Sequence, residues 1–423
     1  MRKFLTLIFI FLSFSVSSAK IENIDDPFLL FEQEKHLNEL YYQIQGMFLD
    51  GLYKMVIKKG KEYLQNASED DERLKEIIKV VTSAYLYTDK PDELYQFVQK
   101  YGKYLSRDLI VRVVIYLQKK EKYNYVKSLF RKYKFLNIEN RHNYKKIKGF
   151  ELGKNIFILG KNQTVFGEND IYISYKNQTL LEVAKEVDMG YYELKIANPD
   201  VNPFDIKKGQ MILLPRRRII PEMDYNLNTI YINLTEKRLY YPTIINKKYY
   251  VITFPVGIGT DDTGTKVGEF QISQKRRNPI WYVPENIRKE NPELPKAFPP
   301  GEDNPLGTRA MRLDHTMLLI HGTNKEFGIG MKVSHGCIRM YNPDVERLFD
   351  IVEEGTSVKI VEKAYKFGVR WKKFYIEIDT DKDINPKEIK EEMKKLNIDT
   401  SKYQDLYKIK LLLIERGYAI PFK

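Results

Sequence analysis

The sequence predicts a multidomain α+β protein, and three observations support this prediction. The chain has 423 residues, enough for two to four domains of ordinary size. Apolar residues follow a helical spacing in the N-terminal third and alternate between Gly, Pro and Asn turns after residue 228. Hydrophobic residues make up 43% of the chain and charged residues 30%, which suffices for buried cores. We therefore expect an all-α region, a strand–helix–helix–strand module, a mostly-β domain and a small α/β tail.

The N-terminus predicts export. Arg2 and Lys3 precede an apolar run at residues 4–16, and small residues then lead to Ala19. This pattern is typical of a signal peptide at residues 1–19 that is cleaved after Ala19. A membrane anchor is the alternative, but the run is shorter than the ~20 residues that span a bilayer. Cleavage removes Arg2 and Lys3, so the formal charge falls from +13 to +11. Outside the inner membrane the anionic surfaces that a positive protein meets are lipid headgroups and the cell wall. A nucleic-acid partner is therefore not expected.

Residues 20–149 are predicted to form an all-α region. Apolar residues recur at i, i+3, i+4 and i+7 in four sets, which begin at Leu37, Leu74, Leu94 and Val126. Paired helices of this length resemble a tetratricopeptide-like solenoid. Such a region would offer a docking surface for a protein partner. A helical domain that only packs on its neighbours explains the pattern equally well.

Residues 150–215 are predicted to hold a short module with one strand, two helices and a second strand. The expected elements cover residues 171–174, 180–187, 191–197 and 210–214. The module resembles a LysM domain, and the matching residues are 179–184, 194–199 and 208–215. The resemblance implies binding to N-acetylglucosamine-containing glycans such as peptidoglycan. In that family the groove lies between the loops that correspond here to residues 176–180 and 198–204.

Residues 228–362 are predicted to form the mostly-β domain, after a linker at Arg216, Arg217, Arg218 and Pro221. One helix stands out among its strands, with Asn342 as its cap and Gly355 as its stop. The tail at residues 363–423 should add a strand pair and two helices, of which Pro386 opens the first. We expect the Lys and Glu runs of the tail to be solvated helix faces without chemistry.

The candidate chemistry lies around Cys337, the only cysteine of the chain. A lone cysteine cannot form an intrachain disulfide or a Cys-rich zinc site. The segment from Ser334 to Arg339 reads Ser-His-Gly-Cys-Ile-Arg, and a His-Gly-Thr element begins at His321. A thiol is mostly protonated at neutral pH, so a nucleophilic cysteine needs a base such as a nearby imidazole. Gly336 would let the backbone turn so that two amides bind an oxyanion. These residues predict acyl transfer through a thioester.

Two alternatives stay open on the residues alone. One is a structural histidine cluster around a buried thiol. The other is a zinc site made by His315, His321, His335 and Cys337.

At these residues the sequence resembles the L,D-transpeptidase (YkuD-type) catalytic domain. The resemblance extends over residues 228–362, through 256–259, 281–284, 299–301 and 304–307 to 355–361. It implies a β-sandwich-like core with a long loop over the active site and no cofactor or metal. A LysM-like module directly upstream is similar to periplasmic members that act on peptidoglycan, so we expect the protein in the periplasm or cell envelope.

The resemblance also assigns roles to residues. It makes Cys337 the nucleophile and His321 the proton acceptor and donor, with His335 and Gly336 beside the thiol at the oxyanion hole. Gly322 stands where some relatives have serine, so a backbone carbonyl must orient the imidazole. Arg339 is expected to anchor a substrate carboxylate, unless it forms a structural salt bridge, and Ser334 to hold the loop.

The implied reaction is attack on a tetrapeptide stem at the L-centre residue before the terminal D-alanine. The acyl group then passes to an amine of another stem to give a 3→3 cross-link, to an outer-membrane lipoprotein lysine, or to water in a carboxypeptidase side reaction. A non-catalytic peptidoglycan-binding scaffold is the competing hypothesis.

Overall fold

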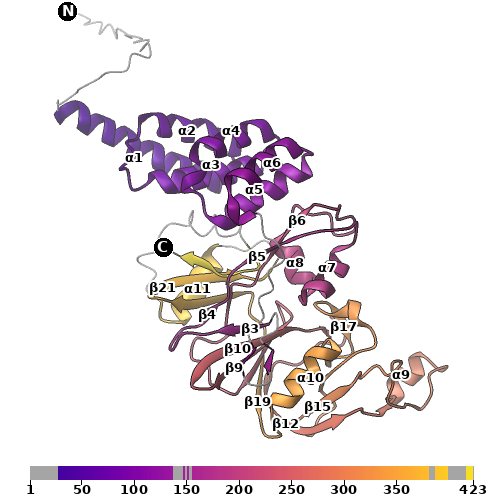
Figure 1. Ribbon diagram of the computed structural model, residues 1–423. Helices are drawn as coiled ribbons and strands as arrows, with labels where there is room; N and C mark the ends of the chain where they lie inside the picture. The colour runs from indigo at the N-terminus through magenta and orange to yellow at the C-terminus, as the bar shows by residue number, and fades with distance from the viewer. Residues whose placement is uncertain are drawn as a thin grey trace, which may run out of the picture.

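The computed structural model describes residues 27–136, 146–147, 150–151, 155–380, 386–398 and 416–422. Figure 1 shows a helical layer at one end, the small module and the C-terminal strands in the middle, and a large curled sheet at the other end. The predicted signal peptide lies outside the described residues, as does the second predicted helix of the tail. Among the helices described, none combines the length and apolarity needed to cross a membrane.

Six α-helices make up the described part of the N-terminal region, as predicted. They are α1 (Pro27–Leu49), α2 (Tyr53–Asn66), α3 (Leu74–Leu86), α4 (Pro91–Tyr101), α5 (Arg107–Lys119) and α6 (Tyr123–Lys132). Ser106 caps α5, because its hydroxyl accepts a hydrogen bond from the amide of Leu109 at 3.2 Å. The helical region was predicted to extend to residue 149, but β1 (Lys146–Ile147) lies within that range and pairs with β2 (Phe150–Glu151).

The predicted strand–helix–helix–strand order of the module is found. It consists of β5 (Asp170–Ile173), α7 (Leu180–Val187), α8 (Tyr191–Ala197) and β6 (Met211–Leu214), with β5 and β6 antiparallel. Thr179 and Glu182 form a capping box at the start of α7. The side chain of Gln118 on α5 bonds the backbone of β6 and its turn, because it donates to the Gly209 carbonyl and accepts from the Met211 amide, both at 2.8 Å.

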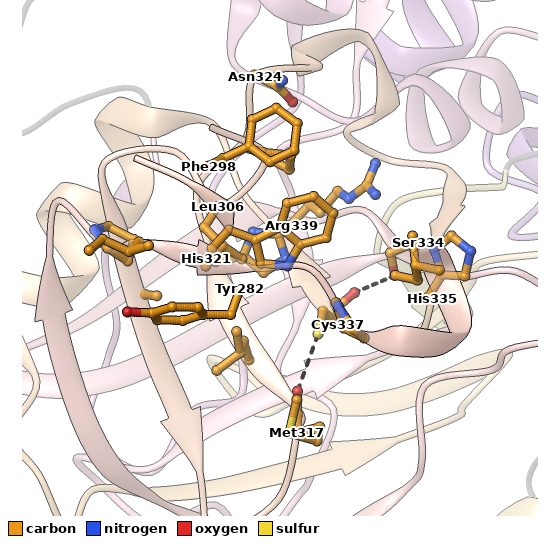
Figure 2. Close-up of a pocket in the computed structure, with 18 of the residues that line it drawn as sticks. Tyr282, Phe298, Leu306, Met317, His321, Asn324, Ser334, His335, Cys337 and Arg339 are labelled. Carbon is orange, nitrogen blue, oxygen red and sulfur yellow. Dashed lines mark hydrogen bonds between the residues drawn. The ribbon is translucent and has the colours of Figure 1, made fainter. Parts of the chain in front are cut away.

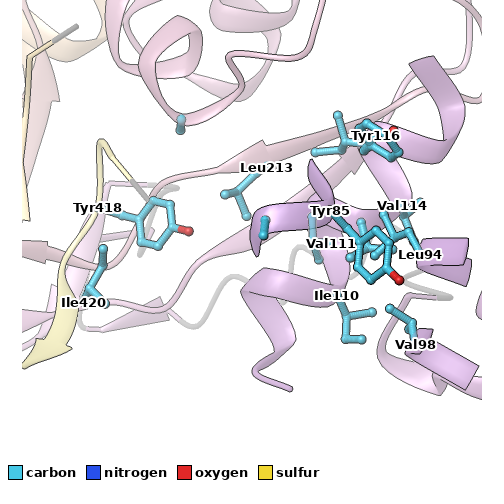
Figure 3. Close-up of a cluster of buried hydrophobic side chains, with 14 of the residues drawn as sticks. Tyr85, Leu94, Val98, Ile110, Val111, Val114, Tyr116, Leu213, Tyr418 and Ile420 are labelled. Carbon is cyan, nitrogen blue, oxygen red and sulfur yellow. The ribbon is translucent and has the colours of Figure 1, made fainter. Parts of the chain in front are cut away.

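One hydrophobic cluster joins the helical region, the module and the tail. Figure 3 shows Ile110 and Val111 of α5, Leu213 of β6, and Tyr418 and Ile420 near the C-terminus in this cluster. The three parts therefore pack as one body.

The predicted catalytic domain and β3 (Ile156–Ile158) together form one curled sheet of nine strands, where a sandwich-like core was predicted. The strand order is β18-β16-β15-β12-β19-β8-β9-β10-β3. The strands are β3 (Ile156–Ile158), β8 (Ile230–Asn233), β9 (Arg238–Ile245), β10 (Lys248–Pro255), β12 (Gly268–Arg277), β15 (Arg309–Leu313), β16 (Leu319–His321), β18 (Ile338–Arg339) and β19 (Ser357–Val361). The first half of β12 pairs with β19 and the second half with β15, with a register shift between Ile272 and Gln274. The two expected layers are thus halves of one sheet.

Smaller elements complete the described fold. They are β4 (Val165–Phe166) with β7 (Arg218–Ile219), β11 (Ile258–Gly259) with β17 (Lys332–Ser334), β13 (Trp281–Tyr282) with β14 (Ala297–Phe298), α9 (Glu285–Glu290), α10 (Asn342–Ile351), β20 (Tyr365–Arg370), β21 (Lys373–Ile378), α11 (Pro386–Lys395) and β22 (Ile420–Phe422). The predicted strand pair of the tail and its helix from Pro386 are both present. β3 falls within the range predicted for the module, yet it pairs with β10 of the large sheet.

The prediction of a linker at Arg216–Arg218 was wrong. Arg218 is 1% exposed and lies in β7, where its guanidinium reaches Glu193 of α8, Glu236 near β9 and Glu377 of β21. Arg238 of β9 also pairs with Glu193, at 2.6 Å. The arginine run is therefore the centre of a buried ion-pair network between module, catalytic sheet and tail.

The tail also contains a buried cation. Lys366 of β20 contacts Glu236 at 2.8 Å, Glu377 at 3.0 Å and Asp379 at 3.3 Å. Burial raises the pKa of Asp379 well above its usual value. The tail is thus part of the network and is more than a solvated extension.

The module lies directly on the loop that follows His321. The amides of Tyr191 and Tyr192 donate to the carbonyls of Ile329 and Gly330 at 3.4 and 3.3 Å. A side chain at Gly330 would overlap the backbone of Gly190. The two glycines therefore permit this close approach.

Candidate active site

The register of two short parallel strands brings the predicted catalytic residues together. His321 ends β16 and pairs with Arg339 of β18, while Cys337 directly precedes β18. Because side chains alternate along a strand, Cys337 and Arg339 fall on the same face as His321. Figure 2 shows all three side chains at one pocket.

The pocket has a volume of about 650 Å³ and lies on this face of the sheet. The same alternation supplies its floor, and the floor residues are Gln274, Arg276, Ala310, Arg312 and Leu319. The segment between β12 and β15 supplies an apolar wall with Ile280, Trp281, Tyr282, Ile287, Leu294, Phe298 and Leu306. This segment is the expected long loop at the active site.

His321 is held in one orientation by its own neighbour. Its ring is 4% exposed, and Nδ1 lies 2.6 Å from the carbonyl oxygen of Gly322, to which a protonated Nδ1 donates. Burial and the charge of Arg339 lower the pKa of His321 to about 4, although the Gly322 carbonyl acts in the opposite direction. The imidazole is therefore neutral at pH 7, with the Nε2 lone pair available to accept a proton. The predicted backbone carbonyl partner is confirmed.

The Cys337 thiol is half-buried and donates to the carbonyl oxygen of Met317, with Sγ and oxygen 3.6 Å apart. Burial raises its pKa, and a Leu319 backbone hydrogen bond and the charges of Arg339 and Arg312 oppose that rise only in part. A protonated thiol that shares a pocket with a neutral imidazole needs that base to remove its proton during attack.

The turn before Cys337 is fixed by hydroxyl groups. Gly336 has φ of 103°, a conformation that favours glycine. Thr265 donates to the Gly336 carbonyl at 2.8 Å, and Thr263 donates to the Ser334 carbonyl at 3.1 Å. Ser334 donates to the Cys337 carbonyl at 2.5 Å, so its hydroxyl holds the loop.

The amides of Gly336 and Cys337 donate to no protein acceptor within the described ranges. They are therefore available to donate to an oxyanion. His335 is exposed and lines the same pocket.

Arg339 forms no salt bridge with any described carboxylate, and its Nε is buried without a hydrogen-bond partner. The alternative of a structural salt bridge therefore has no support in the described part of the chain. An unpaired guanidinium in a catalytic pocket suits a substrate carboxylate.

The zinc alternative does not fit this geometry. Among the described residues, Glu236, Glu377 and Asp379 form the group with metal-ligand spacing, and Lys366 already pairs with all three. No three donors from His315, His321, His335 and Cys337 come within that spacing.

Asn342 was predicted to cap α10, and that prediction was wrong. Tyr341 holds the cap position without a side-chain bond, and the Asn342 side chain turns toward the histidine loop. Its Oδ1 accepts from the amides of Thr308 and Thr323 at 3.3 and 3.2 Å, and its Nδ2 donates to the Thr323 carbonyl at 3.0 Å. A side chain at Gly322 would overlap this Oδ1. Asn342 thus positions the peptide whose carbonyl orients His321.

Asn342→Ala is expected to shift His321 toward the Nε2–H tautomer, which nitrogen NMR of labelled histidine would detect. The implied acylation of Cys337 should slow about tenfold to hundredfold through kcat, because the base loses its alignment. Asn198→Ala is a matched control, since Asn198 also makes three side-chain hydrogen bonds to backbone, but within the module. An unchanged tautomer in Asn342→Ala would contradict the positioning role.

Several residues of the site were not predicted from the sequence. Thr263 and Thr265 brace the nucleophile turn, and Arg276 and Arg312 line the pocket floor. The sequence did contain a signal for the two arginines, which is the alternation of side chains along a strand. This alternation places both on the same face as His321 once the strand register is known.

Comparisons with known proteins agree with the geometry. The L,D-transpeptidase catalytic domain family (YkuD) matches residues 227–360. The probable L,D-transpeptidase YcfS of Escherichia coli K12 is 39% identical over 209 residues, and the match spans 47% of this chain and 64% of that relative's length. The probable L,D-transpeptidase YbiS of the same strain is 35% identical, with 49% of this chain and 67% of that protein covered. A solved catalytic domain from the E. faecium L,D-transpeptidase is 21% identical, with 32% of this chain and 98% of that domain covered and a TM-score of 0.25. The chain belongs to the L,D-transpeptidase family of YkuD type.

Proposed function

We propose that this protein is a cysteine acyltransferase that acts on the tetrapeptide stems of peptidoglycan. The observation that carries the proposal is the neutral, oriented imidazole of His321 in one pocket with the Cys337 thiol and the unpaired Arg339. A thiol with a neutral base in the same pocket is the pair of groups that acyl transfer through a thioester uses.

The reaction begins when His321 Nε2 takes the thiol proton and Cys337 Sγ attacks the carbonyl before the terminal D-alanine. The amides of Gly336 and Cys337 stabilise the oxyanion. His321 then protonates the leaving amine of D-alanine, and the acyl group stays on sulfur. An amine of a second stem, a lipoprotein lysine or water attacks the thioester, and His321 accepts the proton of that nucleophile. The C–S bond then breaks, and the Cys337 thiolate takes this proton back from His321, which restores the starting state.

The other parts of the chain fit work on a cell wall. The module is proposed to bind glycan, and the adjacency of its two groove loops supports this, since the Leu180 amide donates to the Pro203 carbonyl at 2.8 Å. Residues 1–19 are proposed to direct export to the periplasm, and the helical region is proposed to dock a protein partner.

The proposal is tested with purified mature protein and disaccharide-tetrapeptides. We expect D-alanine release, a covalent acyl-enzyme in the intact mass, and cross-linked dimers when a second stem is present. Adding candidate acceptors one at a time identifies the amine that is used. Glycan binding without any D-alanine release would overturn the proposal in favour of a non-catalytic scaffold.

A further inference from the structure

Two arginines lie on the floor of the pocket, on the same face of the sheet as the thiol. β12 and β15 pair Gln274 with Arg312 and Arg276 with Ala310, which makes Arg276 and Arg312 diagonal neighbours on one face. Both line the pocket that holds Cys337. The next residue, Arg277, points to the opposite face and pairs with Asp350 at 2.8 Å.

Neither floor arginine has a carboxylate partner among the described residues. Arg312 is anchored instead by the turn next to the thiol, because its Nη1 donates to the Thr316 carbonyl at 2.6 Å. Asp303 is the one carboxylate among the described residues of the pocket lining, against Arg276, Arg312, Lys325 and Arg339. Unpaired cations in a cleft attract an anionic ligand, and a guanidinium binds carboxylate with two parallel hydrogen bonds.

The place of His321 decides which part of a substrate reaches these arginines. The leaving amine must face His321, which protonates it, and Arg339 pairs with His321 across β16 and β18. Arg339 is therefore on the side of the leaving D-alanine. Across the strands from Cys337, the floor runs over Leu319 of β16 to Arg312 of β15, and Arg276 of β12 follows on the diagonal, two strands beyond His321. With the leaving D-alanine beside Arg339, that floor is the surface left for the acyl part of the donor.

We propose that Arg276 and Arg312 form a second anion-binding site, which binds a free carboxylate on the acyl part of the donor stem. This inference rests on the proposed function, because it assumes a stem peptide in the pocket. It adds a selection rule: stems with that carboxylate intact are good donors, and stems with a carboxamide in its place are poor ones.

The test measures binding apart from chemistry. Disaccharide-tetrapeptides with one carboxylate at a time replaced by carboxamide are titrated by calorimetry into protein carrying Cys337→Ala, which cannot react. We expect one carboxamide on the acyl part of the stem to weaken binding about tenfold to hundredfold, as for loss of a charge-assisted hydrogen bond, separately from any loss at the terminal D-alanine carboxylate, which faces Arg339. That arm also identifies which carboxylate is bound.

Arginine variants complete the test. In the same background, Arg276→Gln with Arg312→Gln should weaken binding of the free-acid stem to the level of its carboxamide and leave the carboxamide unchanged. Arg277→Gln is the matched control and should keep full discrimination. Equal binding of acid and amide stems, or discrimination that survives the double substitution, would overturn the inference. Failure of the proposed function is seen separately, as absence of D-alanine release by the unmodified protein.

Discussion

Cys337→Ala should reduce D-alanine release from tetrapeptide stems by a factor of at least about 10³ and abolish the acyl-enzyme. Cys337 is the only cysteine of the chain, so no second thiol can replace it. The neighbouring Ser334 hydroxyl cannot substitute either, because it is engaged with the Cys337 carbonyl. Release is followed by an amino-acid assay and the acyl-enzyme by intact mass.

The fold of this variant should be intact, because a half-buried thiol contributes little to stability. We expect the free energy of unfolding to change by less than about 1 kcal/mol. D-alanine release that persists in a folded Cys337→Ala protein would exclude the thiol mechanism. Glycan binding should be unaffected in the variant, since the module lies outside the pocket.

Glu193→Gln should destabilise the protein by about 3–5 kcal/mol at pH 7, since it removes one member of a buried charge network and keeps the side-chain volume. Glu193 is the carboxylate between Arg218 and Arg238, and all three side chains are about 2% exposed. Its loss leaves two buried guanidinium groups without their shared partner. Urea unfolding followed by circular dichroism measures the effect.

The loss of stability in Glu193→Gln should also depend on pH in a defined way. Burial alone would raise the pKa of Glu193, but Arg218 and Arg238 outweigh it and lower the pKa from 4.5 to about 2. A carboxylate with a depressed pKa stabilises the fold fully above pH 4.5 and loses that contribution as the pH falls toward 2. The stability difference between the two proteins should therefore shrink over that window.

A surface ion pair supplies the matched control. Glu168 is largely exposed and pairs with Arg370 at 2.7 Å. Glu168→Gln should change stability by no more than about 1 kcal/mol at any pH. A Glu193→Gln effect as small as that, or one that is constant with pH, would contradict the account of the network.

That the predicted catalytic residues meet at one pocket could be expected from the sequence, because their signal is local. Cys337, Gly336 and Arg339 stand within one short motif, and His321 ends a strand that the alternation reveals. The same local reasoning gave a wrong prediction for Asn342, because an asparagine before proline is typical of a helix cap. Its side chain instead accepts hydrogen bonds from the amides of Thr308 and Thr323. Tertiary hydrogen bonds replaced the local capping preference.

The arginine run was unpredictable for a different reason. Three consecutive arginines indicate a solvated linker on composition, but a partner of Arg218 is 159 residues away in the sequence. Likewise, strand patterns cannot show that β12 pairs with two partners, so the single curled sheet could not be distinguished from a sandwich. Only the assembled fold shows which distant carboxylates neutralise the run.

The contact between Gly190 and Gly330 has a consequence for how the enzyme would work on a polymer. A module on a flexible tether raises only the local concentration of its ligand and leaves the angle of approach free. Here the strand–helix–helix–strand module packs directly on the loop after His321, and the buried ion-pair network holds the same junction from inside. If the module binds a glycan strand as proposed, that strand meets the cleft in one fixed orientation. The enzyme would then accept stems that project from the strand at a suitable angle, in addition to selecting them by their chemistry.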